Sequence, residues 1–194
     1  MIKNDTWIKA QAAQGMIAPF EPGLVREVEP GNRVISYGVS STGYDVRLSP
    51  AEFKIFRHIP GTIINPKRFN PENLESVELH TCEDGSYFVL PAHSYGLCVT
   101  QERIAMPPNV TGLLLNKSTL VRCGVVLPAT VIEPSWSGHI TIEVSNSSAA
   151  DVMLFAGEGI GQLLFFEGEP CEVNYSTRQG KYQNQPESVV TARV

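Results

Sequence analysis

Short runs of alternating apolar and polar residues recur along most of the chain, and glycine or proline turns separate them. Alternation with a period of two is typical of a β-strand that buries one face. We expect strands over residues 44–48, 52–56, 62–64, 86–90, 95–100, 110–115, 124–131, 139–145, 151–155 and 162–166. Together with 14 prolines and 16 glycines, this pattern predicts a mainly β fold of the sandwich or barrel type.

A helical pattern is confined to the start of the chain. Asn4 or Asp5 can cap a short helix over residues 7–14, which Gly15 ends. We therefore expect one short N-terminal helix.

Three further stretches lack a clear period. Residues 19–32 hold prolines and glycines that predict an extended connection, and residues 69–76 can add one helical turn. Residues 175–194 are polar and, taken alone, predict a frayed tail.

The composition is that of a soluble globular protein, because 42% of the 194 residues are hydrophobic and 18% are charged. This length predicts a single domain over residues 1–194. The net charge of −5 disfavours a nucleic-acid-binding surface. Any bound phosphate should therefore sit in a local cationic pocket, which favours a nucleotide over a duplex.

Metal and disulfide patterns are not found in the sequence. The four cysteines form no C-x-x-C pair and the four histidines lie away from any cysteine pair, so we expect neither zinc nor disulfides. The H-x-E and P-C-x-x-C signature of zinc-dependent base deaminases is also absent. With no secretory leader and no apolar run near the ~20 residues that span a bilayer, we expect a cytoplasmic protein that enters no membrane.

Polar residues interrupt the apolar stretch 113–146 at two places. The first is a group of two cations and two hydroxyls, Lys117, Ser118, Thr119 and Arg122. Arg and Lys offer charged donors to phosphate, and the hydroxyls add neutral hydrogen bonds. The group indicates an anion-binding turn, although ordinary solvated side chains would give the same pattern.

The second interruption is Glu143. With a period of two, His139, Thr141, Glu143 and Ser145 share one strand face, and the apolar residues between them share the other. The carboxylate of Glu143 therefore faces either solvent or a polar pocket.

Four ordered stretches resemble the dCTP deaminase family, which belongs to the trimeric dUTPase-like superfamily. They are VISYGVSSTGYDVRLS (34–49), NKSTLVRCG with IEPSWSGHITIEVSN (116–124 and 132–146), GEGIGQLLFFEGE (157–169) and YSTRQGKYQNQ (175–185). The likeness runs in order from about residue 2 to residue 185. It implies a dUTPase-like distorted β-barrel or jelly roll with a short N-terminal helix and few other helical turns.

The resemblance implies hydrolytic deamination of dCTP to dUTP and ammonia without a catalytic metal. Glu143 matches the family's catalytic glutamate, and Ser118 and Arg122 match residues that orient water and stabilise developing charge. A half-buried carboxylate with a raised pKa can act as base and then acid on the water and the ring nitrogen.

The resemblance also implies which residues contact the nucleotide. The matched substrate-binding residues are Lys117, Ser118, Thr119, Arg122, Glu133, Thr141, Ile142, Gln162, Tyr175, Lys181 and Gln185. Of these, Thr141 and Ile142 are expected to act through their backbone. Glu133 fits a residue near the sugar, but it fits a surface turn equally well.

Cofactor and assembly are expectations of the same kind. Mg²⁺ should arrive bound to the triphosphate oxygens, with no metal ligands from the protein. Active sites of the superfamily lie between subunits of a homotrimer, so Glu143 and its phosphate contacts are expected to come from different chains. Residues 175–194 order over nucleotide in the family, so we expect a C-terminal lid segment, and dTTP is a candidate inhibitor.

The chain departs from the family pattern at a loop expected to approach the base. Pro128 and Ala129, which precede Thr130, stand where relatives with this spacing usually carry Asn and Val. Proline fixes φ and removes a donor, and alanine leaves extra volume. We expect altered base tolerance, such as acceptance of a 5-substituted dCTP, or altered dTTP inhibition. Asn116 replaces a usual glycine and tolerates a left-handed turn better than most residues.

Two alternative functions remain open. One is a pyrophosphatase of the dUTPase type, or a bifunctional enzyme that also releases diphosphate, although the C-terminal arm lacks the expected glycine-rich pattern. The other is a catalytically silent trimeric nucleotide-binding regulator, which would not need Glu143, Ser118 and Arg122 together.

Overall fold

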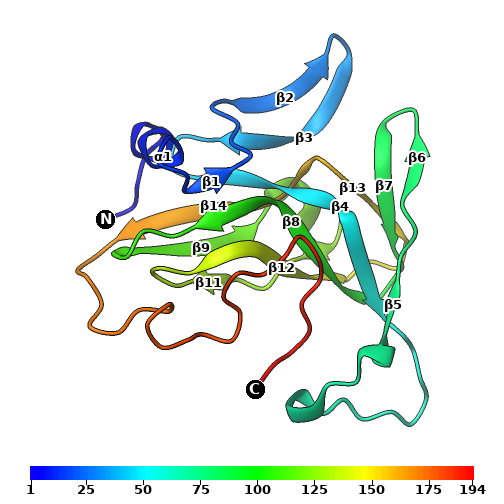
Figure 1. The fold of residues 1–194 in the computed structure, drawn as a ribbon. Helices are drawn as coiled ribbons and strands as arrows, with labels where there is room; N and C mark the ends of the chain where they lie inside the picture. Colours follow the sequence, from blue (N-terminus) through cyan, green and yellow to red (C-terminus); the bar gives the residue numbers. More distant parts are fainter.

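The computed structural model describes all 194 residues and is built mainly from β-strands (Figure 1). The helical elements are α1 (Asp5–Ala12), α2 (Ser118–Val121) and the 3₁₀ turns η1 (Pro66–Arg68) and η2 (Pro71–Asn73). The strands are β1 (Ile17–Ala18), β2 (Leu24–Glu29), β3 (Asn32–Val39), β4 (Tyr44–Phe56), β5 (Leu74–Ser76), β6 (His80–Cys82), β7 (Gly85–Leu90), β8 (Tyr95–Ala105), β9 (Val110–Asn116), β10 (Val125–Val126), β11 (Thr130–Ile132), β12 (Ser137–Asn146), β13 (Val152–Phe155) and β14 (Gly159–Glu167). No helix has the length and apolar character needed to cross a membrane.

The large sheet curls until its two edge strands become neighbours along the chain. Its hydrogen-bonded order is β10-β12-β8-β4-β14-β9-β11, and every neighbouring pair is antiparallel. Only residues 127–129 separate β10 at one edge from β11 at the other. A connection this short spans at most about 14 Å. The sheet therefore closes on itself, which confirms the predicted distorted barrel; we call the junction at residues 125–132 the seam.

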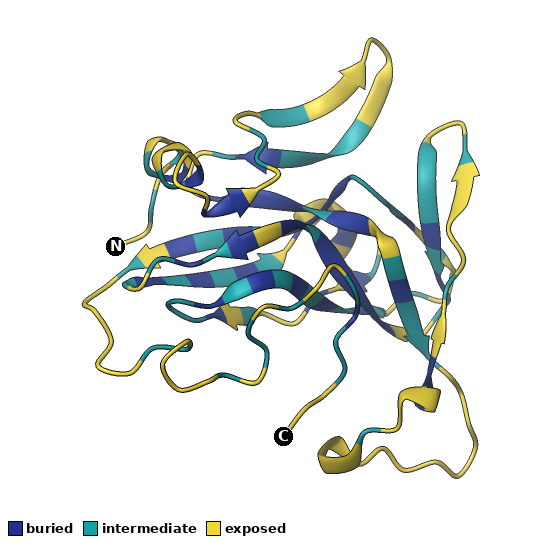
Figure 2. Ribbon diagram, viewed as in Figure 1, coloured by how far each residue is buried: buried dark blue, intermediate teal, exposed yellow.

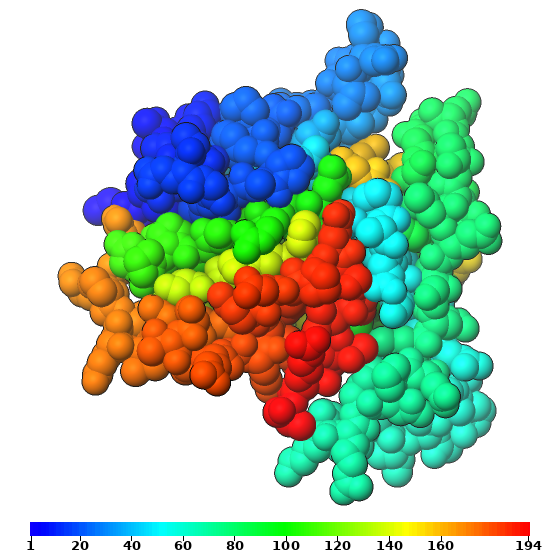
Figure 3. Space-filling view, in the orientation of Figure 1, coloured from blue at the N-terminus to red at the C-terminus, as the bar shows by residue number.

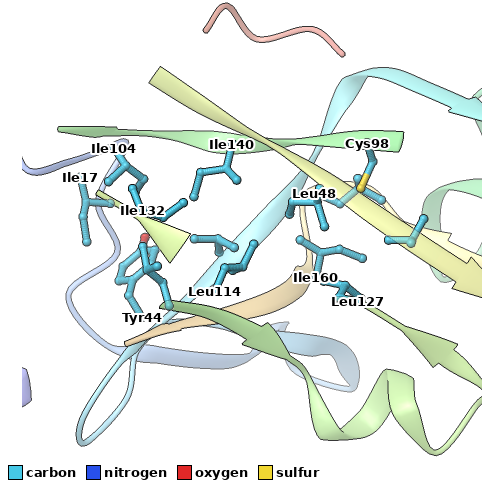
Figure 4. Close-up of a cluster of buried hydrophobic side chains, with 14 of the residues drawn as sticks. Ile17, Tyr44, Leu48, Cys98, Ile104, Leu114, Leu127, Ile132, Ile140 and Ile160 are labelled. Carbon is cyan, nitrogen blue, oxygen red and sulfur yellow. The ribbon is translucent and has the colours of Figure 1, made fainter. Parts of the chain in front are cut away.

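The inside of the barrel holds one large apolar cluster of 27 buried residues. Side chains alternate along each strand, so every second one points to the inside of the barrel. Figure 2 shows buried residues along the barrel strands. Figure 4 shows Leu114, Leu127 and Ile160 close together inside the curled sheet, with Ile132 and Ile140 in the same cluster. Each fully buried Leu or Ile contributes about 1.5–3 kcal/mol to folding.

The N-terminal helix forms as expected. Asn4 is its N-cap and accepts a hydrogen bond from the backbone N–H of Trp7 at 3.1 Å. Gly15 follows the helix with φ of +91°, a left-handed conformation that glycine adopts without strain.

Several predicted strands have different bounds in the structure. The two runs 44–48 and 52–56 join into β4, with an irregularity in pairing between Leu48 and Phe53. The run 124–131 divides into β10 and β11 because residues 127–129 cross the seam. Each difference arises where a strand changes partner.

One predicted strand does not form, one predicted connection is partly regular, and one predicted helical turn is confirmed. Residues 62–64 form a loop, because no strand lies beside them to complete a hydrogen-bonded ladder. Residues 24–29 form β2, which pairs with β3 in a projecting hairpin, so the predicted connection 19–32 is only partly irregular. Within 69–76 the expected turn is η2, and β5 follows it.

The C-terminal residues 175–194 pack against β12, so the interpretation as a frayed tail was wrong. The backbone N–H of His139 donates to the Gln185 carbonyl at 3.0 Å, and that of Asn184 donates to the Ser137 carbonyl at 2.8 Å. Figure 3 shows these residues in red, lying over the strands of the barrel.

Lys117 follows β9 and is buried beneath the hairpin strand β3. Its ammonium forms an ion pair with Asp45 on β4 and donates to the Ser36 hydroxyl at 3.0 Å. Only 8% of Lys117 and 4% of Asp45 are exposed. The structure therefore contradicts the expectation that Lys117 binds phosphate, since its ammonium is buried and paired with Asp45.

We predict that Lys117→Met lowers the free energy of unfolding by about 3–5 kcal/mol, because the substitution leaves Asp45 buried without a counter-charge. Asp45→Asn should cost a similar amount, and the double variant should lose less than the sum of the two. Denaturant unfolding at one fixed protein concentration measures these changes. Wild-type stability of Lys117→Met would contradict the structural role and return Lys117 to the set of candidate phosphate contacts.

Candidate active site

A cavity of about 550 Å³ lies on the outside of the barrel beside the seam. Strands β8, β11 and β12 form its base, and the C-terminal segment forms one wall. The predicted site residues that line it are Thr130, Glu133, Thr141, Glu143, Tyr175, Lys181 and Gln185. Residues distant in sequence therefore meet at one hollow.

Glu143 lies on β12 and is half-buried in the cavity wall. The predicted alternation is confirmed, since Ile140, Ile142 and Val144 are buried on the opposite face. Burial raises the pKa of the Glu143 carboxyl, while its own backbone N–H and the Thr130 hydroxyl nearby lower it. The net result is a raised pKa, as a group that gains and releases a proton near neutral pH requires.

Tyr95 lies close enough to Glu143 to be affected by its charge. Burial and the negative charge of Glu143 both raise the pKa of the Tyr95 phenol. In the β8–β12 pairing, Glu143 is opposite Leu97 and Ser145 is opposite Tyr95. The carboxylate therefore has an apolar neighbour and a phenol at its side.

Thr141 links the cavity to the C-terminal segment. Its hydroxyl donates to the Gln185 side-chain oxygen at 2.9 Å and accepts from the backbone N–H of Val190 at 3.1 Å. Gly138 permits the close approach, because a Cβ there would lie 2.5 Å from the Gln185 nitrogen. The segment is held two residues from Glu143 along the same strand.

The other cavity residues of the C-terminal segment are held by local contacts. The Tyr175 hydroxyl accepts from the backbone N–H of Tyr182 at 2.9 Å, and Lys181 is exposed beside the Tyr182 ring. Glu133 forms an ion pair with Arg178. Glu133 and Glu143 are the carboxylates of the cavity, and Lys181 is its ammonium group.

The predicted anion-binding turn does not line this cavity. Ser118, Thr119 and Arg122 lie on or just after α2 and are exposed, and Arg122 donates to the carbonyl of Ser118 at 3.2 Å. Gln162 on β14 is half-buried and donates to the Ser40 hydroxyl at 3.4 Å, also outside the cavity. Within one chain, the structure therefore separates Glu143 from the polar turn at residues 118–122 and from Gln162, while the expected contacts of the C-terminal segment lie beside it.

The remaining predicted residues lie at the seam or in the core. Pro128 and Ala129 are exposed in the loop between β10 and β11, immediately before Thr130. Ile142 is 2% exposed, so only its backbone is available for a nucleotide contact. Asn116 ends β9 and does not have positive φ, so the expected left-handed turn is wrong there.

Aromatic residues that sequence reasoning missed cover another wall of the cavity. Phe56 and Phe69 meet edge to face with ring centres 6.0 Å apart, and Phe56 and Tyr95 meet at 5.5 Å. Trp136 is buried and donates its indole N–H to the Tyr182 carbonyl at 2.8 Å. These rings come from separate strands and loops that only the folded chain brings together, so no local pattern could have revealed them.

Taken together, the cavity offers an aromatic wall, a half-buried carboxylate with a raised pKa and the Thr130 hydroxyl. An apolar cavity with a few convergent polar groups is the usual form of a small-molecule site. The arrangement can hold a planar group and move a proton to and from it.

Comparison with known proteins places the chain among nucleotide deaminases. A sequence model described as dCTP deaminase-like matches residues 2–168. The dCTP deaminase of Albidiferax ferrireducens is 45% identical over 186 residues, covering 95% of each protein. The dCTP deaminase of Xylella fastidiosa strain M12 is 45% identical over 188 residues, again covering 95% of each.

A solved structure agrees in fold. The 2′-deoxycytidine 5′-triphosphate deaminase of Agrobacterium tumefaciens superposes with a TM-score of 0.59 at 16% identity. The match covers 86% of this chain and 48% of the other, so this chain spans about half the length of that protein. The family model and the relatives that match over 95% of the chain are the stronger findings. They show that the chain belongs to the dCTP deaminase-like family.

Proposed function

We propose that this protein is a dCTP deaminase that hydrolyses the 4-amino group of dCTP, with Glu143 as the general base and acid. The observation that carries the proposal is the half-buried carboxylate of Glu143 in the cavity wall, with a pKa raised by burial. The full-length relatives named dCTP deaminase support the choice of substrate. We also propose that the enzyme works in the cytoplasm.

The chemistry follows from one carboxylate used twice. Ionised Glu143 takes a proton from water as the water oxygen bonds to C4 of the cytosine, and Glu143 passes that proton to ring nitrogen N3. In the tetrahedral adduct, Glu143 carries the second proton of the water to the amino group. The C4–N bond then breaks, ammonia leaves, and C4 keeps the oxygen as the carbonyl of uracil.

Hydroxyl groups and a cation complete the proposed site. Thr130 orients the Glu143 carboxylate, and the Ser118 hydroxyl and Arg122 guanidinium of a neighbouring copy hold the water and the developing negative charge. We propose a homotrimer because Ser118 and Arg122 are exposed and lie outside the Glu143 cavity of their own chain. Thr119 from the same turn and Gln162 would then contact nucleotide across the interface.

The C-terminal segment is proposed to close over the nucleotide as a lid. Tyr175, Lys181 and Gln185 already line the cavity and would contact the sugar and phosphates. Mg²⁺ is proposed to accompany the triphosphate and offset its charge. This fits the donors present, since Glu133 is paired with Arg178 and Glu143 is needed to move protons.

We predict that Glu143→Gln lowers kcat by about 10²–10⁴-fold, because it removes the proton-transfer group while keeping its shape. Ammonia release and chromatography of the product from dCTP with Mg²⁺ measure this change.

In the wild type, we predict that kcat/KM falls as the pH is lowered through the raised pKa of Glu143, because protonation removes the base. A pH profile of kcat/KM should therefore show this fall at a pH above the ordinary range for glutamate.

The same assay distinguishes the alternatives. Release of diphosphate from dUTP would replace the deaminase with a pyrophosphatase of the dUTPase type, or reveal a bifunctional enzyme if ammonia also appears. If the protein binds nucleotide but does not turn over dCTP or dUTP, the result supports a nucleotide-binding regulator. Full activity of Glu143→Gln would remove the proposed role of Glu143.

We predict that two inactive variants restore activity when their subunits are mixed. If each site takes Glu143 from one chain and Arg122 from the next, an equal mixture of Glu143→Gln and Arg122→Ala has about a quarter of its sites intact. Subunits are mixed by co-expression or refolding, and light scattering checks that trimers form. A mixture of Glu143→Gln with Glu143→Ala is the matched control and should stay inactive; no recovery in the first mixture would place both residues in one chain.

We further propose that the Pro128–Ala129 loop enlarges the space beside the base and admits a 5-substituted cytosine. A difference of one methylene in a pocket changes kcat/KM by about 10–200-fold. The double variant Pro128→Asn, Ala129→Val should therefore lower the ratio of kcat/KM for 5-methyl-dCTP over dCTP by at least about tenfold. Inhibition by dTTP is measured on both proteins, and kinetics and inhibition equal to wild type would contradict a role for the loop.

A further inference from the structure

The last residues of the chain cross the barrel after Gln185 and are fastened to β4. The Ser49 hydroxyl donates to a carboxylate oxygen of Glu187 at 2.6 Å. The backbone N–H of Val189 donates to a carboxylate oxygen of Glu52 at 2.6 Å. Figure 3 shows these C-terminal residues in red against the cyan atoms of β4. Two hydrogen bonds to carboxylates therefore join the end of the chain to one strand.

An irregularity in β4 presents the groups that make these bonds. The pairing of β4 with β8 shifts between Leu48 and Phe53, so residues 49–52 bulge from the ladder. A bulge redirects side chains away from the regular alternation. Ser49 is 0% exposed, so its hydroxyl needs an acceptor inside the protein, and Glu187 supplies it. The contact is therefore built into the fold.

Val189 also ties the end of the chain to the aromatic wall of the cavity. Its side chain is buried in a small apolar cluster with Leu74 and Leu97. Phe56 and Phe69 pack against this cluster, and both of them line the cavity. The packing of Val189 and the position of the aromatic wall are therefore linked.

Val190 brings the chain back to the cavity. Its backbone N–H donates to the Thr141 hydroxyl at 3.1 Å. Val190 and Ala192 both line the cavity, as Glu143 does. The end of the chain is therefore part of the cavity wall.

Arg193 connects this end of the chain to the segment that carries Lys181. Its backbone N–H donates to the Tyr182 hydroxyl at 3.0 Å, and its guanidinium donates to the Lys181 carbonyl at 3.2 Å. The Lys181 ammonium lies over the same Tyr182 ring, 5.5 Å from its centre. Residues 187–193 are thus held by β4 near one end and by residues 181–182 at the other, and we call them the clasp.

We infer that the clasp holds Lys181 and the cavity wall in place for the triphosphate, which makes Glu52 and Glu187 positioning residues for substrate binding. The inference rests on the proposed function, in which Lys181 contacts phosphate. Neither carboxylate lines the cavity. Each acts on the substrate only through its hydrogen bond, one to Val189 and the other to Ser49.

The first test compares KM and kcat for dCTP in variants of Glu52. Glu52→Leu removes the acceptor of the Val189 N–H, so the clasp loosens and only a fraction of the molecules holds Lys181 in place. KM should rise about tenfold, because affinity falls with that fraction and a hydrogen bond to a carboxylate is lost. Since β12 carries Glu143, kcat should stay within about twofold of wild type.

Control variants separate positioning from folding. Glu52→Gln keeps an acceptor oxygen and should keep the wild-type KM. Lys54→Met is the matched control, because it removes the ion pair that Lys54 makes with Glu52 at 2.9 Å and leaves the bond to Val189. A loss of folded protein would lower the apparent kcat without changing KM. An equal rise of KM in Lys54→Met and Glu52→Leu would overturn the inference.

Glu187 gives a second route if Glu52→Leu does not fold, because its side chain is exposed. Glu187→Ala should raise KM in the same direction. Ser49→Ala should add nothing in the Glu187→Ala background, since both substitutions remove one hydrogen bond. Wild-type KM values in both Glu52→Leu and Glu187→Ala would overturn the inference.

Amide exchange in the protein without nucleotide keeps this inference separate from the proposed function. The backbone N–H of Tyr182 donates to the Tyr175 hydroxyl and reports on the segment that carries Lys181. Its exchange should speed up in Glu52→Leu and stay slow in Lys54→Met. That result supports the clasp even if dCTP is not the substrate. Wild-type exchange of Tyr182 in Glu52→Leu would reject the clasp even if dCTP is deaminated.

Discussion

Closure of the curled sheet at the seam is the constraint on which the rest of the structure depends. Residues 127–129 join the two edge strands, so β11 is brought close to β12 although the two strands are not paired in the sheet. That proximity puts Thr130 and Glu143 in the same cavity. In an open sheet with the same strand order, five strands would separate β11 from β10 and four would separate it from β12.

The C-terminal segment depends on the same region. It packs along β12 because Gly138 lets the backbone of Gln185 approach and because the Thr141 hydroxyl bonds to both Gln185 and Val190. The position of the segment and the burial of Glu143 are therefore coupled. Burial in turn raises the pKa of the carboxyl, so the packing of an irregular segment contributes to the proposed chemistry.

Much of the barrel could be predicted from the sequence because its strands carry strong local signals. Alternation at Ile140, Ile142 and Val144 was enough to place Glu143 on the outward face of β12. The burial of Lys117 could not be predicted, because its partner Asp45 lies on a distant strand and only the closed barrel brings them together. The aromatic wall of Phe56, Phe69 and Tyr95 escaped prediction for the same reason. Residues 62–64 have the composition of a strand but no partner, which shows that pairing decides strand formation.

Family membership is established by the full-length relatives, while the structure adds how this chain arranges its site. Glu143 and Thr130 meet within one chain, and Ser118 and Arg122 face outward on another surface. This division is the physical reason for proposing a site completed by a second copy. Asn116 and Pro128 mark where this chain differs from the usual pattern, and both restrain the loop at the seam.

The central claim is that the cavity directs water to C4 of the base. Turnover of dCTP in ¹⁸O-labelled water, followed by mass spectrometry of the nucleotide, tests it most directly. The account predicts one ¹⁸O atom in the uracil ring of dUTP, at position 4, and none in the phosphates. Label in a released monophosphate or diphosphate, with the base unlabelled, would contradict it.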